Sequence, residues 1–109
     1  IAAGDNDEDM LCAIKELELC GGGIAVCSAG KILYSLPLPI AGLLSDKNAA
    51  DFINAYSKIT EIAFNLGVNK NIEPFMSLSF LSLAVLPHLK VTDKGLFDVD
   101  KFQFTAHDA

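Results

Sequence analysis

Hydrophobic residues recur at helical spacing near the start of the chain. The pattern predicts a helix over residues 5–20, with Asp5 or Asn6 as its N-cap and acidic side chains at the positive end of its dipole. The triple glycine 21–23 then ends the helix, with one glycine in the left-handed conformation. The apolar face of the predicted helix is formed by Met10, Ile14 and Leu17.

Two short apolar runs follow, over 24–28 and 31–36, joined by a two-residue Ala-Gly link that predicts a β-hairpin. In the second run, Ile32 and Tyr34 alternate with Lys31, Leu33 and Ser35, which puts the first two on one face and predicts a strand with two semi-buried faces. The prolines of segment 37–39 cannot donate ladder hydrogen bonds, so pairing must end there or the strand must become an edge.

A second helix is predicted over 46–66, capped by Ser45 or Asp46 and ended by Gly67. A polar loop over 68–74 comes next. Within 46–66, apolar residues keep the helical period over five turns. Its apolar positions are Ala49, Phe52, Ile53, Tyr56, Ile59, Ala63 and Leu66.

The last third of the chain is less regular. The apolar run 74–87 is bounded by prolines and predicts a helix that Pro74 can open, although part of the run also fits strand alternation. Residues 89–99 predict a strand, a TDKG turn and a second strand. The tail would place Phe102 and Phe104 on one face if it is extended.

These elements predict an α+β fold, with a small, mostly antiparallel sheet and two or three helices packed on one face. The chain has 109 residues, which suits a single domain over 1–109. Apolar residues make up 51% of the chain, so it has either a large core or apolar surface for a partner.

Charge and hydropathy exclude several classes of partner. The net charge is −6 and the eight basic residues form no cluster, which argues against a nucleic-acid surface. No apolar run reaches the roughly 18 residues that a membrane span needs, and no signal peptide is evident. We therefore expect a cytoplasmic protein with no membrane or nucleic-acid partner.

The residues that could carry chemistry are few and scattered. His88 and His107 lie far apart, without an HxH, HExxH or CxxC motif, so a metal site lacks its usual ligands. Cys12, Cys20 and Cys27 are expected to be buried free thiols of a reducing compartment.

Two further motifs have both a functional and a structural interpretation. The glycines 21–23 follow a helix and precede a strand, the reverse of a phosphate-binding loop, so helix termination is favoured. The acidic residues 5–9 could bind a hard cation but lack the calcium-loop pattern, so capping and solvation are favoured. No nucleophile motif is present. We predict no catalytic, cofactor-binding or metal-ligating residue in this chain.

Several long strings nevertheless resemble the C-terminal domain of adenine deaminases, in order and over nearly the whole chain. PLPIAGLLSD and PFMSLSFLSLAVLP are the most specific of them. The strings are GDNDEDM (4–10), GGGIAV (21–26), GKILYSLPLPIAGLLSD (30–46), PFMSLSFLSLAVLPHLKVTDKGLFDV (74–99) and KF (101–102).

The resemblance implies a parent enzyme of the amidohydrolase superfamily that hydrolyses adenine to hypoxanthine and ammonia. The reaction would take place in an upstream TIM-barrel domain with a manganese or iron centre, whose ligand motif has no counterpart here. This chain would pack on that barrel and shape the pocket mouth or an oligomer, with segments 37–42 and 74–80 as the candidates to approach the active site.

An alternative is a stand-alone interaction or ligand-binding module that shares ancestry with the deaminase tail and self-associates through apolar surface. The first residue is Ile1 rather than Met, and IAAG reads as the end of a strand already under way. This start favours the interpretation that the chain is a piece of a longer enzyme.

Overall fold

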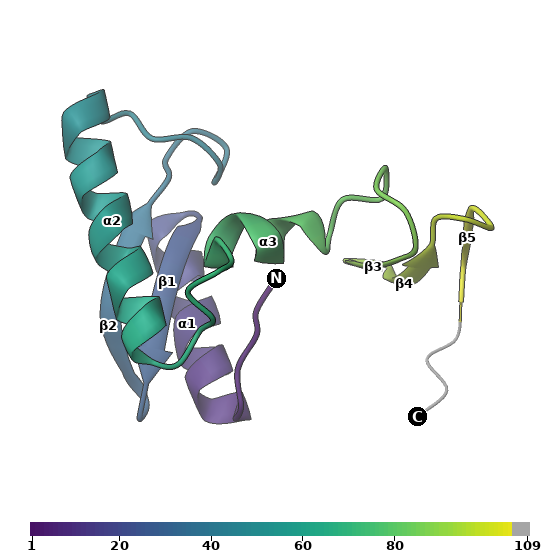
Figure 1. Ribbon diagram of the computed structural model, residues 1–109, viewed down its shortest axis with the longest axis horizontal. Coiled ribbons are helices and arrows are strands. Elements are labelled where there is room, and N and C mark those ends of the chain that lie inside the picture. The colour runs from purple at the N-terminus through teal and green to yellow at the C-terminus, as the bar shows by residue number, and fades with distance from the viewer. Residues whose placement is uncertain (106–109) are drawn as a thin grey trace. The chain divides into compact units, whose positions relative to one another are not determined.

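The computed structural model describes residues 1–105, so His107 lies outside the described residues. It confirms the α+β class, with three helices and two small antiparallel sheets where one sheet was expected (Figure 1). Residues 2–74 form one compact unit; residues 75–105, together with Ile1, belong to a second. The elements are α1 (Asp7–Cys20), β1 (Gly23–Ser28), β2 (Lys31–Pro37), α2 (Ala49–Asn65), α3 (Pro74–Phe80), β3 (Leu89–Thr92), β4 (Gly95–Asp98) and β5 (Gln103–Phe104).

The first helix, α1, ends at Cys20 as predicted and begins at Asp7, two residues later than predicted, with Asn6 as the N-cap. The side chain of Asn6 accepts a hydrogen bond of 2.8 Å from the backbone N–H of Asp9, which satisfies one of the free donors of the first turn. Gly21 follows the last turn with φ 77°, the left-handed conformation that closes many helices. Its N–H donates back to the carbonyl of Glu18.

The hairpin of β1 and β2 contains an irregularity that the alternation pattern did not reveal. Val26 pairs with Tyr34 but Cys27 pairs with Ile32, so Leu33 is an extra residue in a β-bulge. The bulge places Ile32 and Tyr34 on opposite faces, and their predicted shared face is wrong.

The helices α1 and α2 cover opposite faces of this hairpin, which corrects the expectation that they share one face (Figure 1). Ile32 lines a hollow with residues of α1, whereas the Lys58 ammonium of α2 lies 4.9 Å from the ring centroid of Tyr34. A two-stranded sheet has two faces to cover, and one helix on each face covers both.

The second helix, α2, starts later than predicted. Its N-cap is Asn48, whose side chain accepts a 3.0 Å hydrogen bond from the N–H of Asp51, so the expected caps Ser45 and Asp46 are wrong. The buried apolar residues of the described chain all belong to the first unit. They are Val26, Leu36, Leu38, Ile59 and Ala63.

The second unit starts within α3, which ends at Phe80 rather than at residue 87. Beyond Phe80, backbone bonds join residues three apart, as from Leu83 to Phe80, so the α-helix gives way to tight turns. The hydroxyl of Ser82 donates to the carbonyl of Ser79, a local bond that competes with helix continuation.

The strands β3, β4 and β5 form the second sheet, in that order. Lys90 pairs with Phe97, and Phe97 pairs with Phe104, so these three residues share a face. The predicted strand–turn–strand over 89–99 is confirmed, and the tail adds one short strand.

Candidate functional site

No arrangement typical of a metal centre occurs in residues 1–105. Within that range, no three histidine, cysteine or acidic side chains come together in a way that could hold an ion. His88 Nδ1 lies 2.8 Å from one oxygen of Asp100, and both side chains are exposed. This pair is an exposed ion pair when the imidazole is protonated, a contact that contributes little to stability.

The acidic cluster at the start of α1 connects the helix to the hairpin. The carboxylate of Asp9 accepts hydrogen bonds from the N–H of Gly30 at 2.6 Å and of Ala29 at 3.2 Å. It also accepts one from the side chain of Asn6 at 3.0 Å. The bonds from Asn6 and then from Gly30 hold the pKa of Asp9 below its ordinary value. The NDED string therefore has a structural role, in capping α1 and holding the hairpin turn.

Because the pKa of Asp9 is depressed in the folded state, its carboxylate stabilises the fold above the pKa of the unfolded chain, near 3.8. That contribution disappears as the pH falls through the lower folded-state pKa. We expect Asp9→Asn to lower the melting temperature at pH 7, and the difference from wild type to shrink below about pH 4. Thermal melts from pH 2 to 7 test this, with Asp7→Asn as the control. An equal loss in both variants would contradict it.

The glycines 21–23 and the proline-rich segment after β2 meet at close range. The N–H of Leu38 donates to the carbonyl of Gly22 at 3.0 Å, and a side chain added at Gly22 would lie 2.6 Å from the Cα of Gly42. Leu36 and Leu38 are buried, but the turn beyond them exposes Ile40, Leu43 and Leu44. The run PLPIAGLL thus supplies core residues first and an apolar surface loop afterwards.

The cysteines are free thiols, each half-buried. The thiol of Cys27 interacts with that of Cys12 across the α1–β1 contact, and burial, followed by this interaction, raises the pKa of Cys27 to about 12. Such a thiol stays protonated at neutral pH and is a poor nucleophile. Cys20 donates to the carbonyls of Leu17 and Gly22, at the end of α1.

One polar contact within the first unit was not anticipated. The hydroxyl of Tyr56 on α2 donates to the carboxylate of Glu73, in the loop before α3. Burial, and then Glu73, raise the pKa of Tyr56. The helical period marked Tyr56 only as an apolar position, and nothing in the polar loop singled out Glu73. The contact ties the loop to α2.

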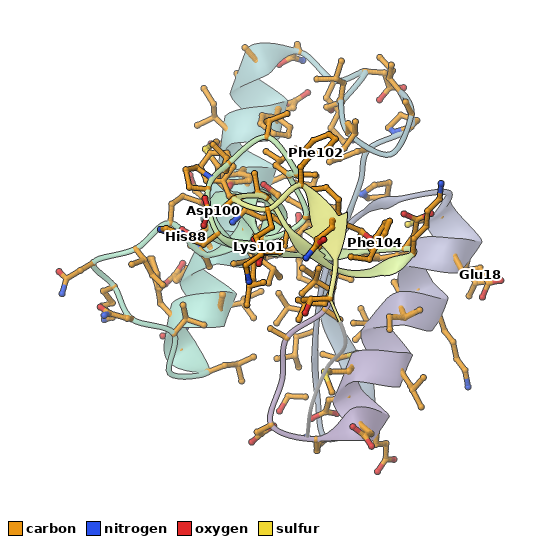
Figure 2. The ribbon with its side chains drawn as sticks, turned by 90° about the vertical axis from the view of Figure 1, so that its right-hand side faces the viewer. Glu18, His88, Asp100, Lys101, Phe102 and Phe104 are labelled. Atoms are coloured by element: carbon orange, nitrogen blue, oxygen red, sulfur yellow. The ribbon has the colours of Figure 1, made fainter. Side chains whose placement is uncertain are left out.

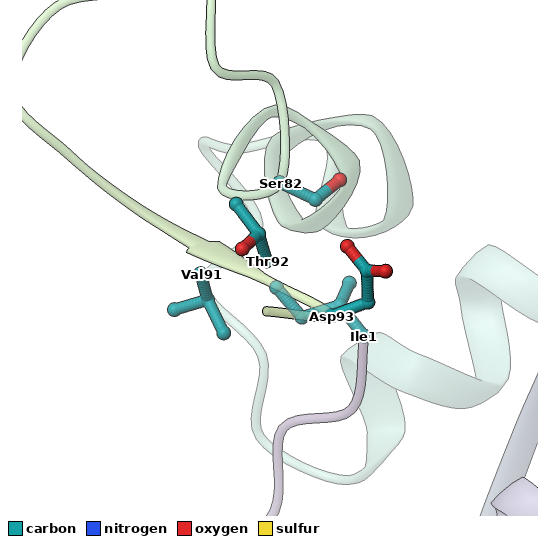
Figure 3. A pocket seen from close by; sticks show the side chains of 5 residues that line it. All are labelled: Ile1, Ser82, Val91, Thr92 and Asp93. Atoms are coloured by element: carbon teal, nitrogen blue, oxygen red, sulfur yellow. The ribbon is translucent and has the colours of Figure 1, made fainter. Parts of the chain in front are cut away.

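The described residues form a hollow in each unit, and neither hollow contains a histidine. One, in the second unit, has a volume of about 480 Å³ and is lined by Ile1, Ser82, Val91, Thr92 and Asp93 (Figure 3). The other, of about 440 Å³, lies beside α1 and includes Cys12 and Ile32. Neither hollow is lined by residues of 37–42 or 74–80, the segments that the sequence singled out.

The last strands carry a group of aromatic side chains that the sequence only partly indicated. The ring of Phe97 meets those of Phe102 and Phe104 edge to face, at centroid distances of 5.4 and 5.2 Å. Phe102 and Phe104 are exposed, and they lie in the region of His88 and Lys101 (Figure 2).

Among residues 1–105, no helix combines the length and the apolar character that crossing a membrane requires.

A family model described as the adenine deaminase C-terminal domain matches residues 1–103. An adenine deaminase of Nitratidesulfovibrio vulgaris (strain DP4) is 54% identical over 106 residues, or 96% of this chain. Adenine deaminase 2 of Carboxydothermus hydrogenoformans is 50% identical over 94% of the chain, and an adenine deaminase of Clostridium acetobutylicum is 50% identical over 95%. The chain spans only 18% of the length of each of these relatives.

Proposed function

Because the chain belongs to the adenine deaminase C-terminal domain family, we propose that it serves as the accessory domain of a longer adenine deaminase. The parent enzyme would hydrolyse adenine to hypoxanthine and ammonia. The family match over nearly the whole chain carries this proposal, together with relatives named adenine deaminases that are about five times longer.

The chemistry would lie in the remainder of the parent. The described residues do not fit a manganese or iron site, since no three imidazole, thiol or carboxylate groups converge within residues 1–105. We propose that such a metal, and the residues that act on adenine, belong to an upstream barrel. This chain would pack on that barrel and border its pocket, and the free thiols support a reducing, cytoplasmic setting.

Adenine turnover tests the proposal. Ammonia release from adenine, with manganese added, would be measured for the 109-residue chain and for the longer parent polypeptide. We expect an active parent and no turnover by the chain alone. Activity of the chain alone would contradict the accessory role and would point to a site that includes His88 and His107. An inactive parent would favour the stand-alone interaction or ligand-binding module, or a different substrate.

A further inference from the structure

Residues 75–105 contain many exposed large apolar side chains and no buried one. Lys90 is the single buried residue among them, and its ammonium donates to the carbonyls of Pro87 and Leu89. Antiparallel sheets commonly keep one face apolar and one face polar. Here one face carries the aliphatic side chains of Leu89, Val91 and Leu96 beside the polar Asp98 and Gln103. The opposite face carries the rings of Phe97 and Phe104 beside Lys90. Exposed apolar patches of this kind can serve as contact surfaces.

Phe97, Phe102 and Phe104 make up what we call the aromatic face. Phe102 is 80% exposed and has φ 52°, and Phe104 is 54% exposed. A bulky side chain in the left-handed region strains the backbone, and an aromatic ring left in water forgoes the stabilisation that burial would give it. The edge-to-face contact with Phe97 leaves most of the Phe102 ring in water, which indicates that the ring is held outward for a partner.

Hydrogen bonds fix the turn that presents Phe102. The carboxylate of Asp98 accepts from the N–H of Lys101 at 3.0 Å and from its ammonium at 3.1 Å. The N–H of Lys101, then its ammonium, hold the pKa of Asp98 below its ordinary value. The N–H of Phe102 donates to Val99, and that of Thr105 to Leu96. A ring held this way loses little conformational freedom on binding.

The two units also differ in net charge. Residues 2–74 contain five lysines and ten acidic residues, whereas residues 75–105 contain three lysines and three aspartates. Most of the acidic excess therefore lies in residues 2–74, whereas residues 75–105 carry no net charge. Cores of protein interfaces are enriched in aromatic residues, and the net charge of residues 75–105 does not oppose their docking on an apolar surface.

We propose that the aromatic face docks into an apolar pocket on the remainder of the adenine deaminase polypeptide, with Phe102 as its anchor. This inference rests on the proposed function. The exposed parts of Phe102 and Phe104 amount to roughly 300 Å², whereas a stable dimer buries about 800 Å² on each partner. So small a patch suits a surface already joined to it by the chain, where docking costs little association entropy.

Site-directed photocross-linking tests this in the full-length parent. Phe102 would be replaced by p-benzoylphenylalanine, a photoreactive residue that keeps the aromatic ring, and the cross-linked peptides identified by mass spectrometry. The matched control places the same residue at Leu19, which is 85% exposed on α1. We expect position 102 to cross-link within one polypeptide to peptides outside residues 1–109, in several-fold higher yield than position 19.

Every other result overturns the inference. Cross-links from position 102 to a second copy would identify a dimer contact, and cross-links to residues 2–74 would mean that the chain covers its own aromatic face. No cross-link, or equal yields at both positions, would leave Phe102 in solvent. Adenine turnover of the same samples keeps the two proposals distinct, because an inactive parent with the expected cross-link would overturn only the proposed function.

Discussion

Replacing Gly23 by alanine should unfold much of the first unit. Gly23 has φ 146°, and an added Cβ would lie within 2.3 Å of the carbonyl oxygen of Leu36 on the paired strand. That oxygen belongs to backbone and cannot rotate away, so the ladder between β1 and β2 must open. Strain and overpacking together should lower the free energy of unfolding by about 3–5 kcal/mol. This is a large part of the total for a small domain, which can be as low as about 5 kcal/mol.

Gly67→Ala is the matched control for this prediction. Gly67 also has a positive φ, 104°, but nothing lies within 4 Å of the added carbon. It should lose only the conformational term, about 1–2 kcal/mol. Urea unfolding followed by circular dichroism compares the two variants with wild type. Similar urea midpoints for both variants would contradict the prediction, because the close approach of Gly23 to Leu36 would then add nothing to the loss of stability.

The second large effect is expected at Ile59. Its side chain on α2 is fully buried, and within residues 1–105 only Leu36 is a comparably buried large side chain. Ile59→Ala leaves a cavity in a core of few residues, so the free energy of unfolding should fall by about 2–5 kcal/mol. The same urea titration measures this loss.

Ile53 provides the control, because it lies on the same helix but is 60% exposed. Ile53→Ala removes the same atoms from a water-exposed position and should change stability by no more than about 0.5 kcal/mol. If both substitutions had equal effects, α2 would not pack on the hairpin through Ile59.

Local signals in the sequence predicted most elements of the fold. A cap at Asp5 or Asn6, a left-handed glycine among residues 21–23 and an Ala-Gly hairpin link were all predicted, and the structure has the cap at Asn6 and the left-handed C-cap at Gly21. The start of α2 was missed because Ser45, Asp46 and Asn48 are all good caps. The position that could bond to the N–H of Asp51 was not evident.

The candidate sites were harder to predict because they depend on residues far apart in sequence. The bulge at Leu33 shifts the register of one strand against another, and no alternation pattern contains that information. Tyr56 and Glu73 meet across a loop, and the rings of Phe97 and Phe102 meet across a turn. The structural role of Asp9 likewise required the hairpin turn to be placed beside α1.

The packing of α1 and α2 on opposite faces of the hairpin has a consequence during synthesis. Once residue 37 has left the ribosome, α1 and the hairpin can assemble within microseconds to milliseconds, because their contacts are close in sequence. Residues 38–65 take a few seconds more at about 5–20 residues per second. For that interval the face of the hairpin with Val26, Tyr34 and Leu36 is not yet covered by α2. The nascent chain therefore exposes an apolar sheet face to chaperones and neighbouring chains.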